Sequence, residues 1–424
     1  MACYQSSLVH IHSLWRSFAC LGINLSRAPN NGNYLRNLKK PYLIFPSHKL
    51  SRKGYCNLSN NVKSSLPGVI HATSLSNVVI PSESEQILRQ DALLNSAKCE
   101  EGALNTNPSD GRVMLIDGTS IMYRAYYRLL AKVHHGHLSH ADGNGDWVLT
   151  IFTALSLIID VLEFIPTHVA VVFDHDGLNF RHTLYPAYKS NRPPTPDTIV
   201  QGLQYLKASI KAMSINVIEV PGVEADDVIG TLAARSVDDG YKVRVVSPDK
   251  DFFQILSPSL RLLRIAPRGF EMVSFGMEDF AEKYGALKPF QFVDVISLVG
   301  DKSDNIPGVE GIGNVHAVHL ITKYGTLENL LQCVDQVEPE RIRKALITNA
   351  EQAVLSKNLA LLRSDLPLYM VPFATRDLTF NKPKDNGEKF ISLLNAISAY
   401  AEGFSANPII RRALHVWKKL DTQH

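Results

Sequence analysis

Residues 222–251 read GVEADDVIGTLAARSVDDGYKVRVVSPDKD, which predicts a helix followed by a strand. The Pro-Gly turn before it opens a predicted helix over VEADDVIGTLAARSVDD, and the β-branched run KVRVVS (242–247) is typical of a buried strand. Acidic residues stand at the start of the helix and directly after the strand: Glu224, Asp226, Asp227, Asp249 and Asp251. A strand that ends in acidic residues is therefore the unit to look for elsewhere in the chain.

The same unit recurs on either side of this stretch. VMLIDG ends in Asp117 and Gly, VAVVFD ends in Asp174, and GDKSDN adds Asp301 and Asp304 downstream. Strands that alternate with helices predict an α/β fold with a mostly parallel sheet flanked by helices. Because ligands bind beyond the carboxyl ends of the strands in such sheets, the nine acids should converge on one site.

Nine carboxylates cannot share a small site unless cations neutralise them. Oxygen ligands without Cys or His suit Mg²⁺ or Mn²⁺, so the pattern predicts a multi-metal phosphoryl-transfer site. Each acid alone has a plainer explanation. Asp117 and Asp174 could form turns, the acids of GVEADD could favour a helix N-terminus, and Asp251 could cap a helix.

Two further segments suggest nucleic acid. FRHTLYPAYKSNR (180–192) interleaves basic and aromatic residues, which suits phosphate pairing and base stacking, although a solvated polar loop explains it equally well. GVEGIG (308–313) lies between short predicted helices, and its glycines would let backbone N–H groups approach a phosphate. We favour a helix–hairpin–helix there over an ordinary connection. HHGHLSH (134–140) could bind zinc, but we interpret it as a loop.

The N-terminus differs from the rest of the chain. Residues 1–82 contain no Asp or Glu and nine Lys or Arg, whereas residues 83–424 carry 35 basic and 41 acidic residues, a net charge of −6. An acid-free, Ser-rich, basic segment predicts a transit peptide for a mitochondrion or a plastid; an untargeted tail is the alternative. Residues 83–111 are predicted to be a disordered linker. Overall charge decides nothing about partners, because the nine acids would be neutralised by metal.

Two classes of protein are disfavoured. The longest apolar run (148–165) contains Asp160 and Glu163, so we expect a buried helix and no membrane partner. Four of the five cysteines precede the body of the chain, which leaves no disulfide framework and no paired-cysteine metal site.

Taken in order, the motifs resemble the 5′→3′ exonuclease domain of bacterial DNA polymerase I and the wider flap-endonuclease family. The resemblance rests on LIDG with Arg124 downstream, VVFD, FRHTLYPAYKSNRPPTPD, GVEADDVIGTLA, DKDFFQIL and LVGDKSDNIPGVEGIG. No polymerase domain follows, so we expect a stand-alone nuclease. It implies a PIN-like catalytic domain (112–285) with a helical arch, an α-helical subdomain with the helix–hairpin–helix (286–405), and a tail (406–424).

The resemblance also implies roles for individual residues. The first metal would be held by Asp117, Asp174, Glu224 and Asp226. The second would be held or oriented, in part through water, by Asp227, Asp249, Asp251, Asp301 and Asp304. Catalytic side chains would be Lys189, Arg192 and Arg124. Nucleic acid would be bound by Arg181, Tyr188, Lys189, Arg192, Lys250, Gly308, Gly311 and Gly313. The cofactors would be two or more Mg²⁺ or Mn²⁺ ions about 4 Å apart, with K⁺ a candidate ion at the helix–hairpin–helix.

The implied activity is metal-dependent 5′→3′ exonuclease and 5′ flap endonuclease cleavage by a monomer. Its partner would be DNA with 5′ flaps, nicks or ends, with an RNA primer strand as a further substrate. One departure weakens the predicted grip on the duplex: after GIG the family has a Lys and a Thr, whereas this chain has NVHA (314–317).

Two other functions remain open. FDHDG (173–177) mimics the signature of haloacid-dehalogenase phosphatases, in which Asp174 would be a nucleophile and Asp176 a general acid. A non-catalytic, structure-specific DNA-binding protein is the other alternative.

Overall fold

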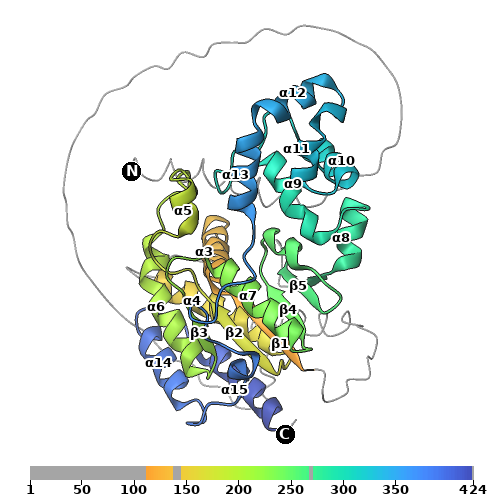
Figure 1. Cartoon of the computed structure of the whole chain (residues 1–424). Coiled ribbons are helices and arrows are strands. Elements are labelled where there is room, and N and C mark those ends of the chain that lie inside the picture. Colours follow the sequence, from red (N-terminus) through yellow and green to blue (C-terminus); the bar gives the residue numbers. More distant parts are fainter. Residues whose placement is uncertain (1–110, 137–144, 267–270, 423–424) are drawn as a thin grey trace, which may run out of the picture. The chain divides into compact units, whose positions relative to one another are not determined.

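The computed structural model describes residues 111–136, 145–266 and 271–422. Together these residues make up the body of the chain (Figure 1). The predicted transit peptide, nearly all of the predicted linker and the second part of the His-rich loop (137–140) lie outside the described residues.

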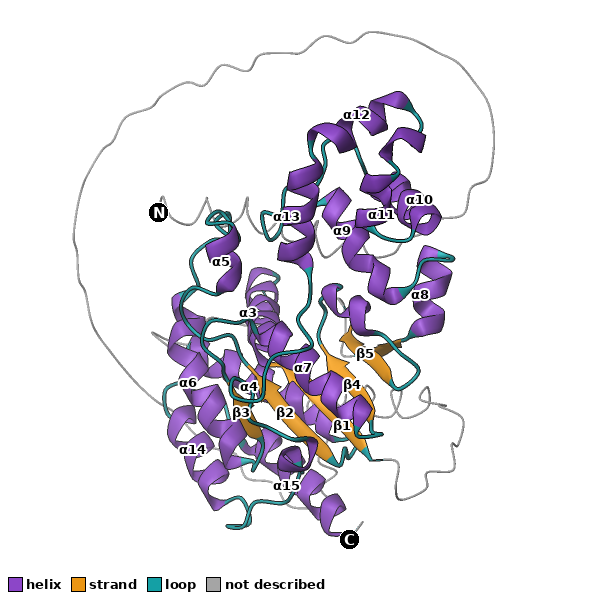
Figure 2. Cartoon of the chain, viewed as in Figure 1, coloured by secondary structure: helices purple, strands orange, loops and turns teal. Residues whose placement is uncertain are grey.

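A six-stranded sheet forms the centre of the body, with strand order β3-β2-β1-β4-β5-β6 (Figure 2). Its strands are β1 (Arg112–Asp117), β2 (His168–Val172), β3 (Asn216–Ile218), β4 (Lys242–Val246), β5 (Leu260–Ile265) and β6 (Met272–Phe275). Every neighbouring pair is parallel except β5 and β6. The predicted mostly parallel sheet is confirmed, and β5 and β6 are strands that were not predicted.

The central strands are apolar because both of their faces are covered. In β1, Val113 and Leu115 belong to one buried cluster, and Met114 and Ile116 belong to another. Alternate side chains of a strand point to opposite faces, so this division places one core on each side of the sheet.

One core lies under the long helices. They are α3 (Gly118–His134), α4 (Asp146–Leu162), α6 (Asp197–Ala212), α14 (Glu388–Ser398) and α15 (Asn407–Asp421). Helix α4 is buried along most of its length, as the apolar run predicted. No helix in the described residues has the length and apolar character needed to cross a membrane.

The C-terminal residues differ from the prediction of a tail after residue 405. Trp417 of α15 is fully buried, and Arg412 forms ion pairs with Asp160 of α4 and with Glu163, which follows that helix. Helix α15 is amphipathic, and its apolar side closes the core over α4, so 407–421 is part of the fold.

The other face carries helix α7 (Ala225–Asp238) and the helical subdomain. The remaining helices are α5 (Phe180–Leu184), α8 (Met277–Tyr284), α9 (Phe292–Val299), α10 (Asn314–Tyr324), α11 (Leu327–Gln332), α12 (Glu340–Thr348) and α13 (Ala350–Ala360). Short 3-10 helices are η1 (Asp251–Ile255), η2 (Pro289–Gln291), η3 (Val334–Gln336) and η4 (Thr375–Leu378). Helix α5 is the only helix described between β2 and α6, so the predicted helical arch stays a prediction.

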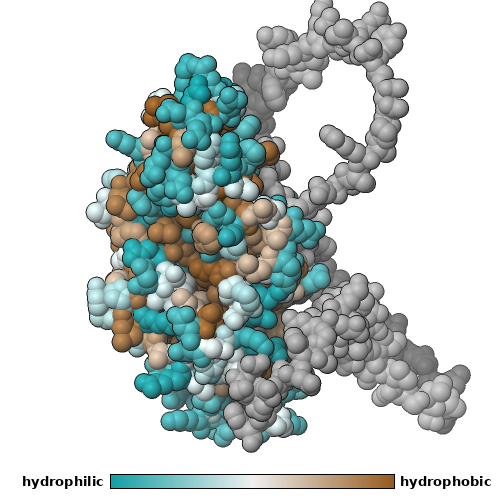
Figure 3. All heavy atoms as spheres, turned by 45° about the vertical axis from the view of Figure 1, so that its right-hand side comes forward, coloured by the Kyte–Doolittle hydropathy of each residue, from teal (hydrophilic) through white to brown (hydrophobic). Residues whose placement is uncertain are grey.

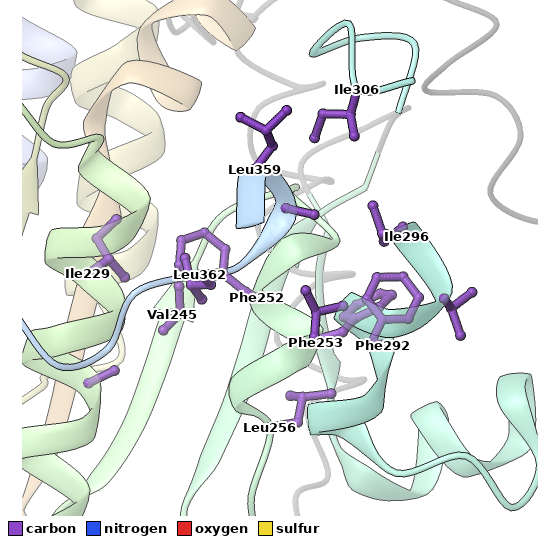
Figure 4. Close-up of a cluster of buried hydrophobic side chains, with 14 of the residues drawn as sticks. Ile229, Val245, Phe252, Phe253, Leu256, Phe292, Ile296, Ile306, Leu359 and Leu362 are labelled. Carbon is purple, nitrogen blue, oxygen red and sulfur yellow. The ribbon is translucent and has the colours of Figure 1, made fainter. Parts of the chain in front are cut away.

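The sheet and the helical subdomain share one apolar core (Figure 4). Val245 of β4 and Phe253 of η1 belong to the same buried cluster as Phe292 and Ile296 of α9 and Leu359 of α13. Burying this common surface fixes the subdomain beside the carboxyl ends of the strands.

The outer surface is mixed. Figure 3 shows one face on which apolar side chains gather across the middle, with hydrophilic side chains above and below. Large apolar side chains that remain exposed include Val273, Met277 and Phe290. They belong to β6, α8 and η2, which follow one another along the chain.

Candidate active site

The predicted acids lie beyond the carboxyl ends of four parallel strands. Asp117 ends β1 and pairs in register with Val172 of β2, while Ile116 pairs with Val246 of β4. Asp174 follows β2, Glu224 caps the helix after β3, and Asp249 follows β4. The topology therefore brings acids from segments far apart in sequence to one edge of the sheet.

Asp117 is buried and held by two serines. One carboxylate oxygen accepts from the Ser120 N–H at 2.9 Å, and the other accepts from Ser247 Oγ at 2.8 Å. Burial, together with the charge of Asp174, raises the pKa of Asp117 to about 6 despite these hydrogen bonds. Ser247 also accepts from the Asp249 N–H at 3.2 Å. Ser247 was not among the predicted site residues, and its only signal in the sequence is its place between β4 and Asp249.

Asp174 is fixed between two helix starts. Its carboxylate accepts from the Ala225 N–H at 2.9 Å, and its own N–H donates to Thr119 Oγ1 at 2.9 Å. Asp174 therefore sits between the first turns of α3 and α7, which lie directly beside the predicted ligands Asp117 and Asp226.

Asp226, Asp249 and Asp251 form the most strongly repelling part of the cluster. Burial and the neighbouring acids raise the pKa of Asp226 and of Asp251 well above the usual range, and burial together with the charge of Asp304 raises that of Asp249. Asp251 also has a buried carboxylate oxygen without a hydrogen-bond partner. An orphaned oxygen among repelling carboxylates fits a cation, and an all-oxygen set fits Mg²⁺ or Mn²⁺. Within the described residues, no three His, Cys, Asp or Glu side chains are arranged to hold a metal ion. The acids would therefore have to reorient to bind one.

Two predicted basic residues lie against the other acids of the cluster. Lys189 Nζ is 2.5 Å from Glu224, and Arg192 is 2.6 Å from Asp304. Burial opposes ionisation of both acids, but the nearby cations outweigh it and lower the pKa of Glu224 and of Asp304. Lys189 has a left-handed backbone (φ 56°), and its N–H donates to the Asp304 carbonyl at 2.9 Å. Such strain in a non-glycine residue is typical of functional sites.

Tyr188 lies inside the cluster. Its hydroxyl is 3.1 Å from Glu224 Oε2 and 3.2 Å from Asp304 Oδ2, and its side chain is buried. One hydroxyl hydrogen can serve only one of these acids at a time. Asn179, which was not predicted to belong to the site, donates from Nδ2 to Glu224 at 2.9 Å. In this structure Tyr188 orients carboxylates, which differs from its predicted contact with nucleic acid.

Asp227 and Arg181 require a correction. The Arg181 guanidinium bonds both oxygens of Asp227, at 2.6 and 2.8 Å, and both side chains are buried. Asp227 also accepts from the backbone N–H groups of Arg363 at 3.0 Å and Glu224 at 3.3 Å. Both carboxylate oxygens of Asp227 therefore already accept hydrogen bonds from within the protein. We interpret Asp227 as a structural acid and not as a metal ligand. Arg181, enclosed beside it, is not placed to bind nucleic acid.

Asp301 and Asp304 reach the site because two loops are joined. Asn191 Nδ2 donates to the Lys302 carbonyl at 2.6 Å, and Asn305 Nδ2 donates to the Ala187 carbonyl at 2.7 Å. Asp301 accepts from Lys250 Nζ at 2.8 Å. The predicted phosphate-binding Lys250 is thus held by an acid at the edge of the cluster.

Arg124 lies beside the acids without an ion pair to them. It donates to the Ala266 carbonyl, and its Nε is buried without a partner. Burial and the charge of Arg128 lower the pKa of Arg124 to about 10. Arg124 lines a small cavity together with Ser120 and Ser247, the two serines that hold Asp117.

The three predicted phosphate-binding glycines have different environments. A Cβ on Gly308 would lie 2.3 Å from the Gly300 nitrogen, and the Gly308 N–H donates to Ser356 at 3.1 Å. Gly308 is therefore needed for packing, and its N–H is not available to a phosphate. Gly311 (φ +83°) and Gly313 border open space, and Gly313 begins α10 without a side-chain cap. These two positions suit close approach of a phosphate to a helix N-terminus.

The histidines of the His-rich loop are only partly described. His134 and His135 end α3 with their rings in edge contact. The other histidines of the loop lie outside the described residues, so the zinc hypothesis stays open.

Comparisons with known proteins agree with this architecture. A family model described as "5'-3' exonuclease, N-terminal resolvase-like domain" matches residues 112–285, and one described as "5'-3' exonuclease, C-terminal SAM fold" matches residues 287–386. DNA polymerase I of Bacillus caldotenax is 36% identical over 287 residues, which cover 68% of this chain and 31% of that protein. The thermostable DNA polymerase I of Thermus thermophilus is 39% identical over 258 residues, or 61% and 29%.

The chain thus spans about a third of the length of these curated relatives. Among solved structures, zinc-bound T5 5′-exonuclease matches with a TM-score of 0.49 and 21% identity, over 68% of this chain and 99% of that one. The two family models lie end to end over residues 112–386 and together cover the sheet and the helical subdomain. This chain belongs to the 5′-3′ exonuclease family.

Proposed function

We propose that this protein is a divalent-metal-dependent 5′→3′ exonuclease and 5′ flap endonuclease that hydrolyses DNA phosphodiesters. One observation carries the proposal: acids that follow β1, β2, β3 and β4 share one edge of the sheet with Lys189 and Arg192. A partly buried acidic cluster bordered by cations suits a bound phosphodiester and the ions that neutralise it.

The acids that have no cationic partner among the described residues are the candidate ligands. They are Asp117, Asp174, Asp226, Asp249 and Asp251. The raised pKa values within this set and the orphaned oxygen of Asp251 support their use as ligands for Mg²⁺ or Mn²⁺. Bound there, two ions would activate water and stabilise charge on the leaving oxygen.

The basic residues would then act on the substrate. Lys189 and Arg192 are held by Glu224 and Asp304 at the rim of the cluster. A phosphodiester entering the site would compete for these cations, which would stabilise the charge that develops on its oxygens. Tyr188 would keep Glu224 and Asp304 oriented while the cations change partners.

Access to the cluster explains the proposed preference for ends and flaps. Asp117 is buried and Asp226, Asp249 and Asp251 are partly buried, so a paired base step cannot reach the whole ligand set without distortion. Terminal nucleotides unpair at lower cost than internal ones, which favours 5′ flaps, nicks and frayed ends. The open N-terminus of α10 at Gly313 would hold a duplex phosphate beside the site.

Cleavage of a 5′-labelled flap duplex by the full chain, in Mg²⁺ and in EDTA, tests this proposal. We expect flap release only with metal, products with a 5′ phosphate, and no hydrolysis of a small phosphate ester. Binding without release would favour a non-catalytic DNA-binding protein. Hydrolysis of the ester without flap release would favour a phosphatase that uses Asp174 and Asp176.

We also propose that residues 1–82 direct the protein to a mitochondrion or a plastid. The absence of any acid among these residues, together with nine basic ones, supports this proposal. A fluorescent protein fused after residue 110 should enter one of these organelles. Diffuse fluorescence in the cytosol would refute the targeting role.

A further inference from the structure

A second group of basic residues lies at the β5 side of the acidic cluster. β5 runs parallel to β4, so its carboxyl end lies at the same edge as Asp249. Arg264 is the penultimate residue of β5, and the Arg124 guanidinium bonds Ala266 just beyond it. Lys189 and Arg192 approach the cluster from the segment between α5 and α6 instead. Basic residues therefore border the acids on two sides.

Arg264 and Lys283 are held together by an aromatic surface. The Arg264 guanidinium lies 5.9 Å from the Phe253 ring centroid, and Lys283 Nζ lies 5.8 Å from the same centroid. Lys283 also lies 5.4 Å from the ring of Tyr284. Arg264 donates to the carbonyl of Pro248 at 3.2 Å, one residue before Asp249. The pair is thus anchored close to a candidate metal ligand.

Among the residues that the structure describes, these cations lack anionic partners. Neither Arg264, Lys283 nor Arg124 forms an ion pair with a described carboxylate within 4.0 Å, whereas Lys250 pairs with Asp301. Burial and the positive charges of Arg264 and Lys250 lower the pKa of Lys283. The charge of Asp249 favours the ionised form of Arg264 but does not pair with it, so holding Arg264 and Lys283 together costs free energy that an anionic ligand would recover.

We infer that Arg264 and Lys283, with Arg124 on the neighbouring α3, bind successive phosphates of a nucleic-acid backbone that leaves the active site past β5 and α8 (Figure 1). This inference rests on the proposed nuclease function and deepens it. Lys189 and Arg192 would bind the substrate on the β2 side of the scissile phosphate, whereas Arg264, Lys283 and Arg124 would bind it on the β5 side. Substrate would then be held across the metal cluster from both directions.

A phosphate backbone fits this surface better than a small anion does. Arg264 and Lys283 both lie on the Phe253 ring, whereas Arg124 reaches the end of β5 from α3 and lines a cavity with Leu263 and Ile265. Leu263 and Ile265 belong to the opposite core from Phe253, so the cations border β5 on both of its faces. An extended polyanion can reach both faces of a strand end, and one phosphate ion cannot.

The salt dependence of DNA binding tests the inference. The full chain and an Arg264→Gln/Lys283→Gln variant would be titrated with fluorescent flap DNA in EDTA, between roughly 50 and 200 mM KCl. Each lost phosphate contact should reduce the slope of log affinity against log salt by about 0.9, so the variant should lose about 1.8. An unchanged slope would overturn the inference.

Two matched variants separate binding from folding and from net charge. Arg264→Lys/Lys283→Arg keeps both charges and should restore the wild-type slope. Lys418→Gln/Lys419→Gln removes two exposed charges from α15 and should leave the slope unchanged. An equal loss in this α15 variant would show a general charge effect and refute a local site. If wild type cleaves flaps in Mg²⁺ but the Gln variant keeps its slope, only this inference fails; if wild type neither binds nor cleaves, the proposed function fails with it.

Discussion

Arg181 and Asp227 form a buried, bidentate ion pair, with nitrogen–oxygen distances of 2.6 and 2.8 Å. Arg181 also donates to the carbonyls of Leu359 and Leu361, at 2.8 Å each. The pair therefore ties α5 and the first turn of α7 to the segment that leaves α13. Since Glu224 and Asp226 belong to that same turn, the pair also fixes where two acids of the site stand.

Loss of Arg181 should destabilise the protein more than it weakens DNA binding. Arg181→Ala leaves the Asp227 carboxylate buried without its partner, which should cost about 3–5 kcal/mol of unfolding free energy in urea titrations. Arg376→Ala, at an exposed position, should change it by less than about 0.5 kcal/mol. A stable Arg181→Ala protein with a shallower salt dependence of DNA binding would restore the predicted nucleic-acid role of Arg181.

The acidic cluster should destabilise the metal-free protein as pH rises. The pKa of Asp117 in the folded protein is about 6, above its ordinary 3.8, so the folded state holds this proton more tightly than the unfolded state. Stability is therefore lost as pH rises from about 4 through 6. Asp117→Asn should gain up to about 3 kcal/mol at pH 8 in EDTA and nothing at pH 4. Thermal unfolding at both pH values checks this, and a variant less stable at pH 8 would contradict it.

Substitutions at two glycines of GVEGIG should distinguish a packing role from a DNA-binding role. Gly308→Ala places a methyl group against the backbone of Gly300 and should cost more than about 2 kcal/mol of stability. Gly313→Ala has room and an ordinary φ of −98°, so it should cost less than about 1 kcal/mol while weakening DNA binding. Paired urea and DNA titrations measure both effects. Equal stability losses would show that Gly313 is also a packing position.

Tyr188 should act through its hydroxyl. Tyr188→Phe keeps the ring and removes the donor shared by Glu224 and Asp304, so cleavage at saturating DNA should fall roughly 10-fold. Tyr185→Phe is the control, because the Tyr185 hydroxyl makes no hydrogen bond among the described residues. A large loss of DNA affinity with an unchanged cleavage rate would instead favour the predicted contact with nucleic acid.

The sequence alone was enough to locate the strands that carry the acids, because β-branched runs that end in Asp can be recognised without tertiary information. It could not separate Asp226 from Asp227, since the partner that distinguishes them, Arg181, lies 46 residues from Asp227. β5 and β6 were not predicted, because each contains only one β-branched residue, Ile265 or Val273, in place of the β-branched runs of β1, β2 and β4. The packing role of Gly308 could not be predicted either, because its close contact with Gly300 depends on the path of the loop between them.

The helix at the C-terminus shows a different limit. Residues 407–421 have an amphipathic pattern that predicts a helix, but the pattern does not say which surface its apolar side covers. The buried Trp417 and the ion pairs of Arg412 with Asp160 and Glu163 supply that information. Interactions between segments far apart in sequence thus account for most of what the sequence could not predict.

Acids from separate strands should form one metal-dependent site, and single-turnover cleavage of a 5′-labelled flap duplex by Asp249→Ala and Asp174→Ala would show whether they do. Each variant should lose cleavage in Mg²⁺ by at least about 1,000-fold, or about 4 kcal/mol of transition-state stabilisation, while DNA binding largely survives. Undiminished cleavage in both purified variants would contradict the shared site.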